Sequence, residues 1–185
     1  MNRLLIIILL TFVCMQVNAQ SKPETEMPID ETTKLVTYTN VIEMPDNDKG
    51  KVYDKALAWA NAFYKNPTDV IRDKDVASGI IICKARFKIM NVPKKRSDIT
   101  TDAGMVQYTL KIEMKDNRYK YTLTDINWKQ VSYYAIERWM DTRAPGYSDS
   151  YADYLNQTNQ ECKKIIADLV STMVKKDAAK STNDW

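Results

Sequence analysis

The chain has 185 residues, 27 basic against 24 acidic side chains, a net charge of +3 and no histidine. The lack of histidine removes the commonest general base, the commonest metal ligand and every catalytic triad built on imidazole, so we expect neither a metal nor a cofactor. The mild positive charge does not by itself indicate a polyanionic partner.

The N-terminus has the pattern of a secretory signal peptide. Arg3 precedes an apolar run from Leu4 to Met15, and small residues end at Ala19. The run is shorter than the roughly 20 residues that span a bilayer, so we expect no membrane span once residues 1–19 are removed. The sequence therefore predicts an exported chain, periplasmic or extracellular, that begins at Gln20. Residues 20–33 contain two prolines and are predicted to form a flexible leader.

A strand and a helix are predicted next. Alternating apolar residues over 35–44 predict the strand. Asp48 is a good N-cap for a helix that runs to about Lys65, where Asn66-Pro67 stops it. Within this helix Val52, Ala56, Trp59, Ala60 and Phe63 share one face, which is typical of a helix that packs on a sheet.

Four strands follow the helix. A short strand is expected near 70–72 and a longer one over 80–90, and the aperiodic residues 92–104 predict a loop. Strict alternation over 106–115 and 119–124, joined by Asp116-Asn117, predicts a hairpin. The alternation changes phase at Asp125, which indicates a β-bulge.

The C-terminal third combines an aromatic segment with a long helix. Residues 129–147 are irregular, with a short helix expected over 134–140, and helical spacing predicts a helix over 150–176. The order strand, helix, four strands, helix predicts an α+β domain over 34–177: an antiparallel curved sheet of about five strands with two helices on one face. Residues 178–185 are expected to form a frayed tail.

Several of these stretches together resemble a known bacterial family. They are residues 53–63, Val70-Ile71, residues 79–87 and the hairpin 108–125. In combination they are similar to the domain of unknown function 4468, an exported family of Bacteroidetes-type bacteria. The resemblance covers about 35–128 and implies a TATA-binding-protein-like fold and an envelope location. It implies no catalytic residues, and the segment 129–147 departs from the family pattern.

The polar face of the predicted sheet is basic. Its candidate binding residues are Lys84, Arg86, Lys88, Lys111 and Lys120. They could attract an anionic partner electrostatically, and for an exported chain an acidic glycan, a lipid head group or an envelope protein is a better candidate than nucleic acid. The alternative is an ordinary solvated sheet face whose charges prevent aggregation.

Aromatic residues form a second candidate site. They are Trp128, Tyr133, Tyr134, Trp139 and Tyr147. Such residues can stack on sugars or anchor a protein partner, or the segment can fold over the core and bury them.

Cys83 and Cys162 both fall on apolar positions and are predicted to point into the interface between sheet and helices. They could form a disulfide, which needs Cα atoms within about 7 Å, or remain free as small apolar side chains.

The residues thus favour a non-enzymatic envelope domain that binds another molecule or belongs to an assembly. The alternative is a hydrolase that uses carboxylates or tyrosine. Two convergent carboxylates with shifted pKa values in a deep pocket would identify it.

Overall fold

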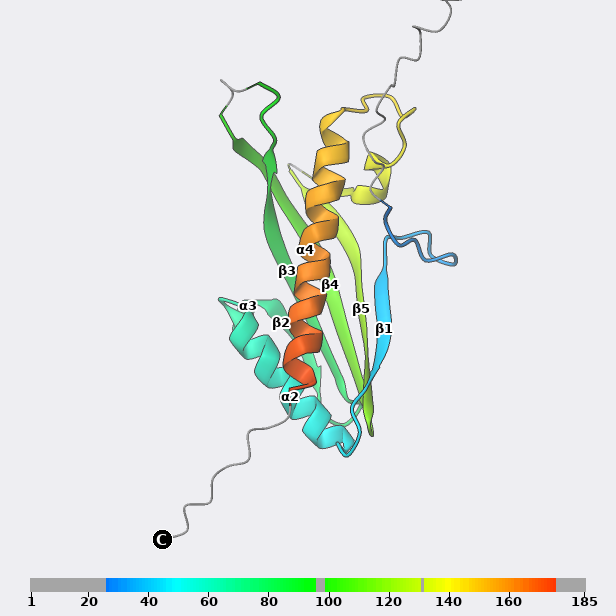
Figure 1. The fold of residues 1–185 in the computed structure, drawn as a ribbon, viewed down its shortest axis with the longest axis vertical. Helices are drawn as coiled ribbons and strands as arrows, with labels where there is room; N and C mark the ends of the chain where they lie inside the picture. The colour runs from blue at the N-terminus through cyan, green and yellow to red at the C-terminus, as the bar shows by residue number, and fades with distance from the viewer. Residues whose placement is uncertain (1–25, 96–98, 131, 176–185) are drawn as a thin grey trace, which may run out of the picture.

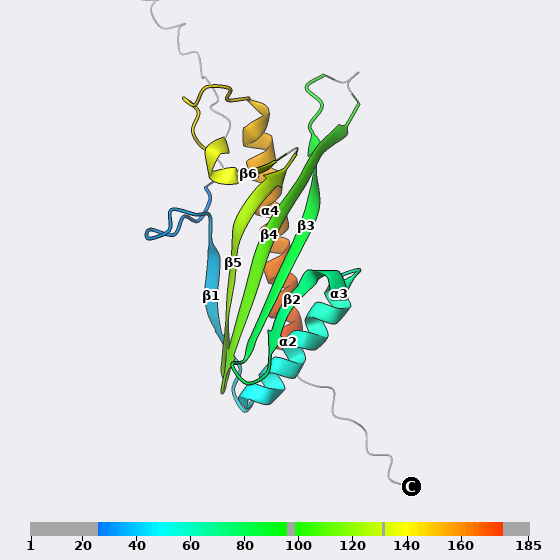
Figure 2. The same ribbon diagram turned by 180° about the vertical axis from the view of Figure 1, so that it is seen from behind.

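The computed structural model describes residues 26–95, 99–130 and 132–175; the expected signal peptide (1–19) and tail (178–185) lie outside these ranges. A six-stranded sheet forms one layer and the long helices form a second layer on one of its faces (Figures 1 and 2). Every strand pair is antiparallel. The expected α+β architecture is confirmed.

The elements follow the chain order β1 (Tyr38–Glu43), α2 (Lys49–Phe63), α3 (Pro67–Val70), β2 (Ile71–Asp75), β3 (Ile80–Asn91), β4 (Thr101–Lys115), β5 (Arg118–Lys129), β6 (Tyr133–Ala135), a 3-10 turn (Ile136–Trp139) and α4 (Ser150–Met173). In space the strands lie in the order β1-β5-β4-β3-β2, and the short β6 pairs with the end of β5. The sheet thus has one strand more than the sequence predicted, because part of the segment 129–147 joins it.

Helix α2 begins where the sequence predicts. The Asp48 carboxylate accepts a hydrogen bond from the Lys51 backbone N–H at 2.8 Å, and this satisfies one of the free donors of the first turn. Val52, Ala56 and Trp59 are buried against the sheet and α4. The helix ends at Phe63, two residues before the predicted limit, and Pro67 opens the single turn α3.

The central hairpin confirms both the predicted turn and the predicted bulge. Asn117 in the turn has φ +60°, the left-handed conformation that this residue tolerates. Gln107 pairs with Asn127 and Thr109 with Thr124, so two residues of β5 lie opposite one residue of β4. Asp125, in the bulge, has φ +52°. The bulge returns the apolar side chains of both halves of β5 to the core.

Four local predictions were wrong. The helix expected over 134–140 begins as a strand, because residues 134 and 135 belong to β6, and only 136–139 form a 3-10 turn. Residues 101–104 belong to β4 instead of the predicted loop, because they pair with the end of β3 across a second register shift. Val70 is in α3, so β2 begins one residue later than predicted. The predicted leader also extends too far, because Met27 is buried and Ile29 bridges to Val36.

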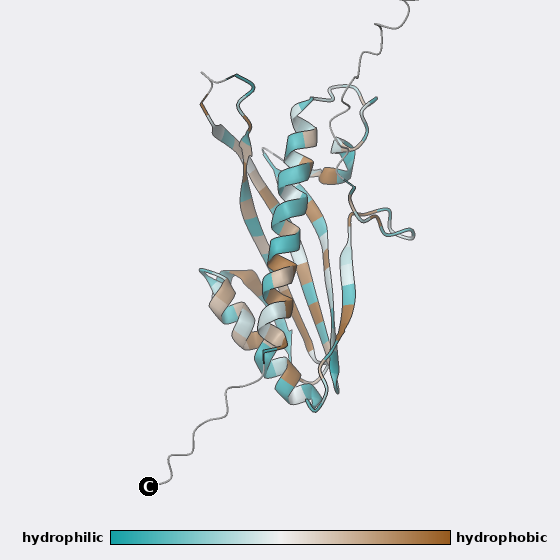
Figure 3. Cartoon of the chain, in the orientation of Figure 1, coloured by the Kyte–Doolittle hydropathy of each residue, from teal (hydrophilic) through white to brown (hydrophobic). Residues whose placement is uncertain are grey.

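The core lies between the sheet and the helices. From α4 it receives mainly Leu155, Cys162, Ile165, Leu169 and Met173, which are spaced three, four or seven residues apart on one helix face. The side of α4 turned to the viewer in Figure 3 is hydrophilic over its N-terminal half. Within the described ranges, no helix is long and apolar enough to cross a membrane.

Candidate functional site

The five predicted basic residues lie on the sheet face opposite the helices. On β3, Lys84, Arg86 and Lys88 are exposed and alternate with buried or half-buried residues. The register places Lys111 opposite Ile82 of β3, and Lys120 opposite Glu113 of β4. The sequence therefore placed these side chains on the correct face, and their binding of an anion stays a prediction.

Two of these five cations are neutralised by neighbouring carboxylates. Lys88 Nζ lies 2.7 Å from Asp102 Oδ2, and Lys111 Nζ lies 2.8 Å from Glu113 Oε1. Hydrogen bonds from Lys88 and from the Gly104 backbone hold the pKa of Asp102 below its ordinary value. Across the described residues, Lys84 and Arg86 form no ion pair, so their charge is available to a ligand.

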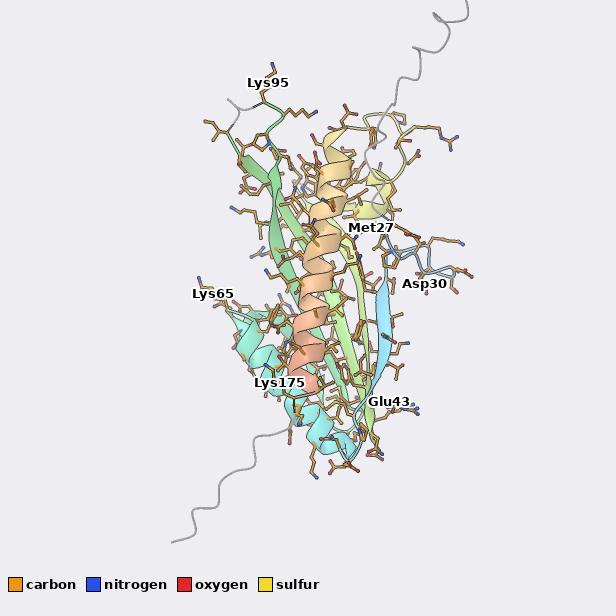
Figure 4. The ribbon with its side chains drawn as sticks, in the orientation of Figure 1. Met27, Asp30, Glu43, Lys65, Lys95 and Lys175 are labelled. Carbon is orange, nitrogen blue, oxygen red and sulfur yellow. The ribbon has the colours of Figure 1, made fainter. Side chains whose placement is uncertain are left out.

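Lys84 and Arg86 line a groove of about 820 Å³ at the β3 edge of the sheet. The groove extends from the α2–α3 corner, past β2 and β3, to the end of β5 and the start of β6. Figure 4 shows Lys65 projecting from that corner on the same side of the molecule as β3. The charged residues of the lining are five cations and one carboxylate: Lys65, Arg72, Lys84, Arg86, Lys129 and Asp69.

One predicted aromatic residue reaches this groove. Tyr133 is 57% exposed, and its hydroxyl donates to Gln107 Oε1 at 3.4 Å. Lys129 Nζ lies 5.7 Å from the centre of the Tyr133 ring, within the range of a cation–π interaction. The groove thus combines part of the basic face with one residue of the aromatic segment. The sequence predicted these two features as separate sites.

The other predicted aromatic residues do not form a common contact surface. Trp139 is buried, and its ring packs 5.5 Å from that of Trp128. The half-buried Trp128 donates from Nε1 to the Ala103 carbonyl at 2.8 Å. Tyr134 packs edge-on against Trp128, and Tyr147 against Tyr151 of α4. These side chains join α4 to the end of the sheet.

Cys83 and Cys162 are both buried and free, so the structure does not contain the disulfide that the sequence allowed. Burial raises the pKa of each thiol to about 12. The Tyr64 hydroxyl hydrogen-bonds Cys83, which slightly opposes that rise. Both thiols are neutral at physiological pH and serve as small packing groups.

Lys65, Arg72 and Lys129 line the groove and were not predicted as binding residues from the sequence. They come from the α2–α3 link, β2 and the end of β5, and only the strand order brings them together. In the part of the chain that the structure describes, Cys, Asp and Glu side chains do not gather in threes that could hold a metal ion.

The model of one protein family matches residues 38–129, which include β1 to β5 and most of the groove. This family is a domain of unknown function with a TBP-like fold, DUF4468. The chain belongs to the DUF4468 family. The family resemblance of the sequence is thereby confirmed.

Solved structures agree with this assignment. A TBP-like protein from Parabacteroides distasonis superposes with a TM-score of 0.63 at 15% identity, over 82% of this chain and 99% of that one. A DUF4468 family protein from Bacteroides ovatus gives the same TM-score at 16% identity, over 82% of this chain and 92% of that one. At such identities the likeness shows the shared fold alone. No curated protein matches the chain.

Proposed function

We propose that this DUF4468 chain is an exported, non-enzymatic binding domain whose groove takes an anionic partner. The observation that carries the proposal is the charge of the groove, where five cations and one carboxylate line about 820 Å³. Lys84 and Arg86, at its centre on β3, have no carboxylate partner among the described residues.

A concave surface with an excess of cations binds an anion better than a flat surface with the same charges does. The low-dielectric walls of a cleft focus the field of the charges that line it. The guanidinium groups of Arg72 and Arg86 can each donate two hydrogen bonds to one carboxylate, sulfate or phosphate group. We rank binding above hydrolysis because the described residues give the lining a single carboxylate, Asp69, whereas glycoside hydrolases typically use two.

Export rests on the sequence of the first 19 residues. A basic residue, an apolar run and a small-residue site favour cleavage after Ala19 and release into the periplasm or beyond. The partner is then an envelope molecule, and nucleic acid is not expected there. N-terminal sequencing of the protein from the cell envelope should yield a chain that begins at Gln20, and a chain that keeps Met1 would contradict export by this route.

Charge reversal in the groove tests the binding proposal. Residues 20–185 would be titrated with three fluorescent anionic probes: a sulfated heparin oligosaccharide, phosphatidylglycerol vesicles and a glutamate-rich peptide. For at least one probe, the double variant Lys84→Glu with Arg86→Glu should lose at least about tenfold in affinity. Its melting temperature should hardly change, because both side chains are exposed.

A matched control separates the groove from overall charge. Lys115→Glu with Lys120→Glu changes the net charge equally, on the same sheet face, at residues that do not line the groove. This variant should keep affinity within about threefold of the native chain. Equal weakening by both double variants, or no binding of any probe, would contradict the proposal.

A further inference from the structure

The outer edge of β3 is only partly covered. β2 pairs with Ile80, Ile81, Ile82 and Cys83, whereas β3 continues to Asn91. Figure 2 shows β3 running well beyond the end of β2. From Lys84 to Ile89, in the described part of the chain, β3 has a strand on one side only, which is β4.

Hydrogen bonds at the two ends of β3 show which residues face outward. Just before the strand, the Gly79 carbonyl accepts from the Met114 N–H of β4 at 2.8 Å. At the other end, the Met90 N–H donates to Gln157 Oε1 at 2.9 Å, and the Met90 carbonyl accepts from Gln157 Nε2 at 2.8 Å. The backbone N–H and C=O groups alternate in direction along a strand. Odd-numbered residues of β3 therefore direct these groups toward β4, and even-numbered residues direct them toward the opposite edge.

Three residues therefore direct their backbone N–H and C=O groups to the open edge. They are Lys84, Arg86 and Lys88, which lie between the part covered by β2 and the Met90 groups covered by Gln157. The same three residues carry exposed cationic side chains on the sheet face opposite the helices. Lys84 and Arg86 have no carboxylate partner among the described residues, and Lys88 pairs with Asp102. This edge borders the groove, because Lys84, Ala85 and Arg86 line it.

We propose that this edge binds an extended, acidic segment of a partner protein as an added antiparallel strand. This inference rests on the proposed function and names the anionic partner. The added strand would lie in the direction of β2, which already pairs with β3 in antiparallel orientation. Residues directly opposite one another in an antiparallel pair share a face, so the acidic side chains lie at alternate positions, opposite Lys84, Arg86 and Lys88.

The side chains between the acidic residues would point to the helix side of the sheet. There the groove is lined by Tyr64 of the α2–α3 link and Val70 of α3, which favours small apolar residues. The favoured partner sequence is therefore acidic–apolar–acidic–apolar–acidic. A polypeptide fits this edge better than a glycan or a lipid, because donors and acceptors at strand spacing match only another backbone.

Backbone methylation of a peptide tests the added strand. The probe is fluorescein-labelled Gly-Glu-Val-Glu-Val-Glu-Gly, titrated by fluorescence anisotropy against residues 20–185. Opposite the outward-facing residues of β3, the glutamate N–H groups donate to the protein, and the valine N–H groups point away. N-methylation of the three glutamates should weaken binding by at least about tenfold, whereas N-methylation of the two valines should leave it within about threefold.

The outcomes separate this inference from the proposed function. Equal binding of both methylated peptides, with loss in the Lys84→Glu, Arg86→Glu variant, would overturn the added strand and leave anion binding intact. The same conclusion would follow if only the heparin or vesicle probe bound in a manner sensitive to that variant. If neither the peptide nor the heparin and vesicle probes lost affinity in the Lys84→Glu, Arg86→Glu variant, both the added strand and the proposed function would be overturned.

Discussion

The two faces of β3, β4 and β5 differ sharply, although the same strands form both. Toward the helices, Leu110, Ile112 and Leu123 are completely buried. On the opposite face, Lys84, Lys88 and Lys120 are exposed, and β4 and β5 add half-buried threonines. Burial of apolar area stabilises the fold on one face, while the other face is free to vary in charge. Substitutions on the open face should thus report on binding with little change in stability.

The largest change in stability is expected on the sheet face that packs against the helices. Leu110→Ala should lower the free energy of unfolding by about 3 kcal/mol, because it removes a completely buried side chain and leaves a cavity. Thr109→Ala, on the same strand but the open face, should cost less than about 1 kcal/mol. Urea unfolding of both variants measures the difference, and equal losses would mean that the two faces contribute alike.

The second largest effect is expected at alkaline pH, which should lower the stability of the fold through the buried thiols. Burial raises the pKa of Cys83 and of Cys162 from 9.0 to about 12, so both stay protonated in the folded chain while the unfolded chain ionises. Their contribution to stability is complete below pH 9 and is lost as the pH rises toward 12. Burial also raises the pKa of Tyr64 and Tyr108, which adds loss of the same sign above pH 10.

Unfolding midpoints in urea at pH 8 and pH 10.5 measure this loss. The double variant Cys83→Ala, Cys162→Ala is the matched control, because it lacks both thiols and should show a smaller drop between the two pH values. A native chain whose midpoint stays constant or rises with pH would show that the thiols are accessible to water in the folded state.

A smaller effect is expected at the edge of β3. Gln157→Ala removes two hydrogen bonds to Met90 and should lower the free energy of unfolding by about 1 kcal/mol. The control is Gln160→Ala, an exposed residue of the same helix, which should change it by less than about 0.5 kcal/mol. Hydrogen exchange at Met90 should accelerate in the Gln157 variant alone, and unchanged exchange would contradict the role of Gln157 as an edge cover.

Local patterns in the sequence were sufficient for most elements, and pairing between distant segments explains the errors. Asp48 marked the start of α2, and the phase change at Asp125 marked the bulge, because both signals lie within a few residues. Residues 101–104 carry no apolar alternation, and they are a strand because β3 pairs with them. Met27 was missed as a core residue for a similar reason, since the main chain folds back through Ile29 and Val36.

The candidate site was predictable in its chemistry and not in its extent. Alternation along β3 places Lys84 and Arg86 together on the open face without any tertiary information. The contributions of Arg72 and Lys129 depend on the strand order, which the sequence does not specify. The start of β2 at Ile71, opposite Cys83, leaves the edge of β3 open from Lys84 onward. It likewise follows from the turn α3 that Pro67 begins.

Amide NMR of the complex would show where on the sheet the acidic peptide binds. Uniformly ¹⁵N-labelled residues 20–185 would be titrated with the unmethylated Glu-Val peptide, and hydrogen exchange would be followed in the complex. We predict the largest shift changes at the groove, with slower exchange at the amides of Lys84, Arg86 and Lys88. Changes centred on Lys115 and Lys120 instead, or spread evenly over the open face without slower exchange along β3, would contradict the groove as the binding site.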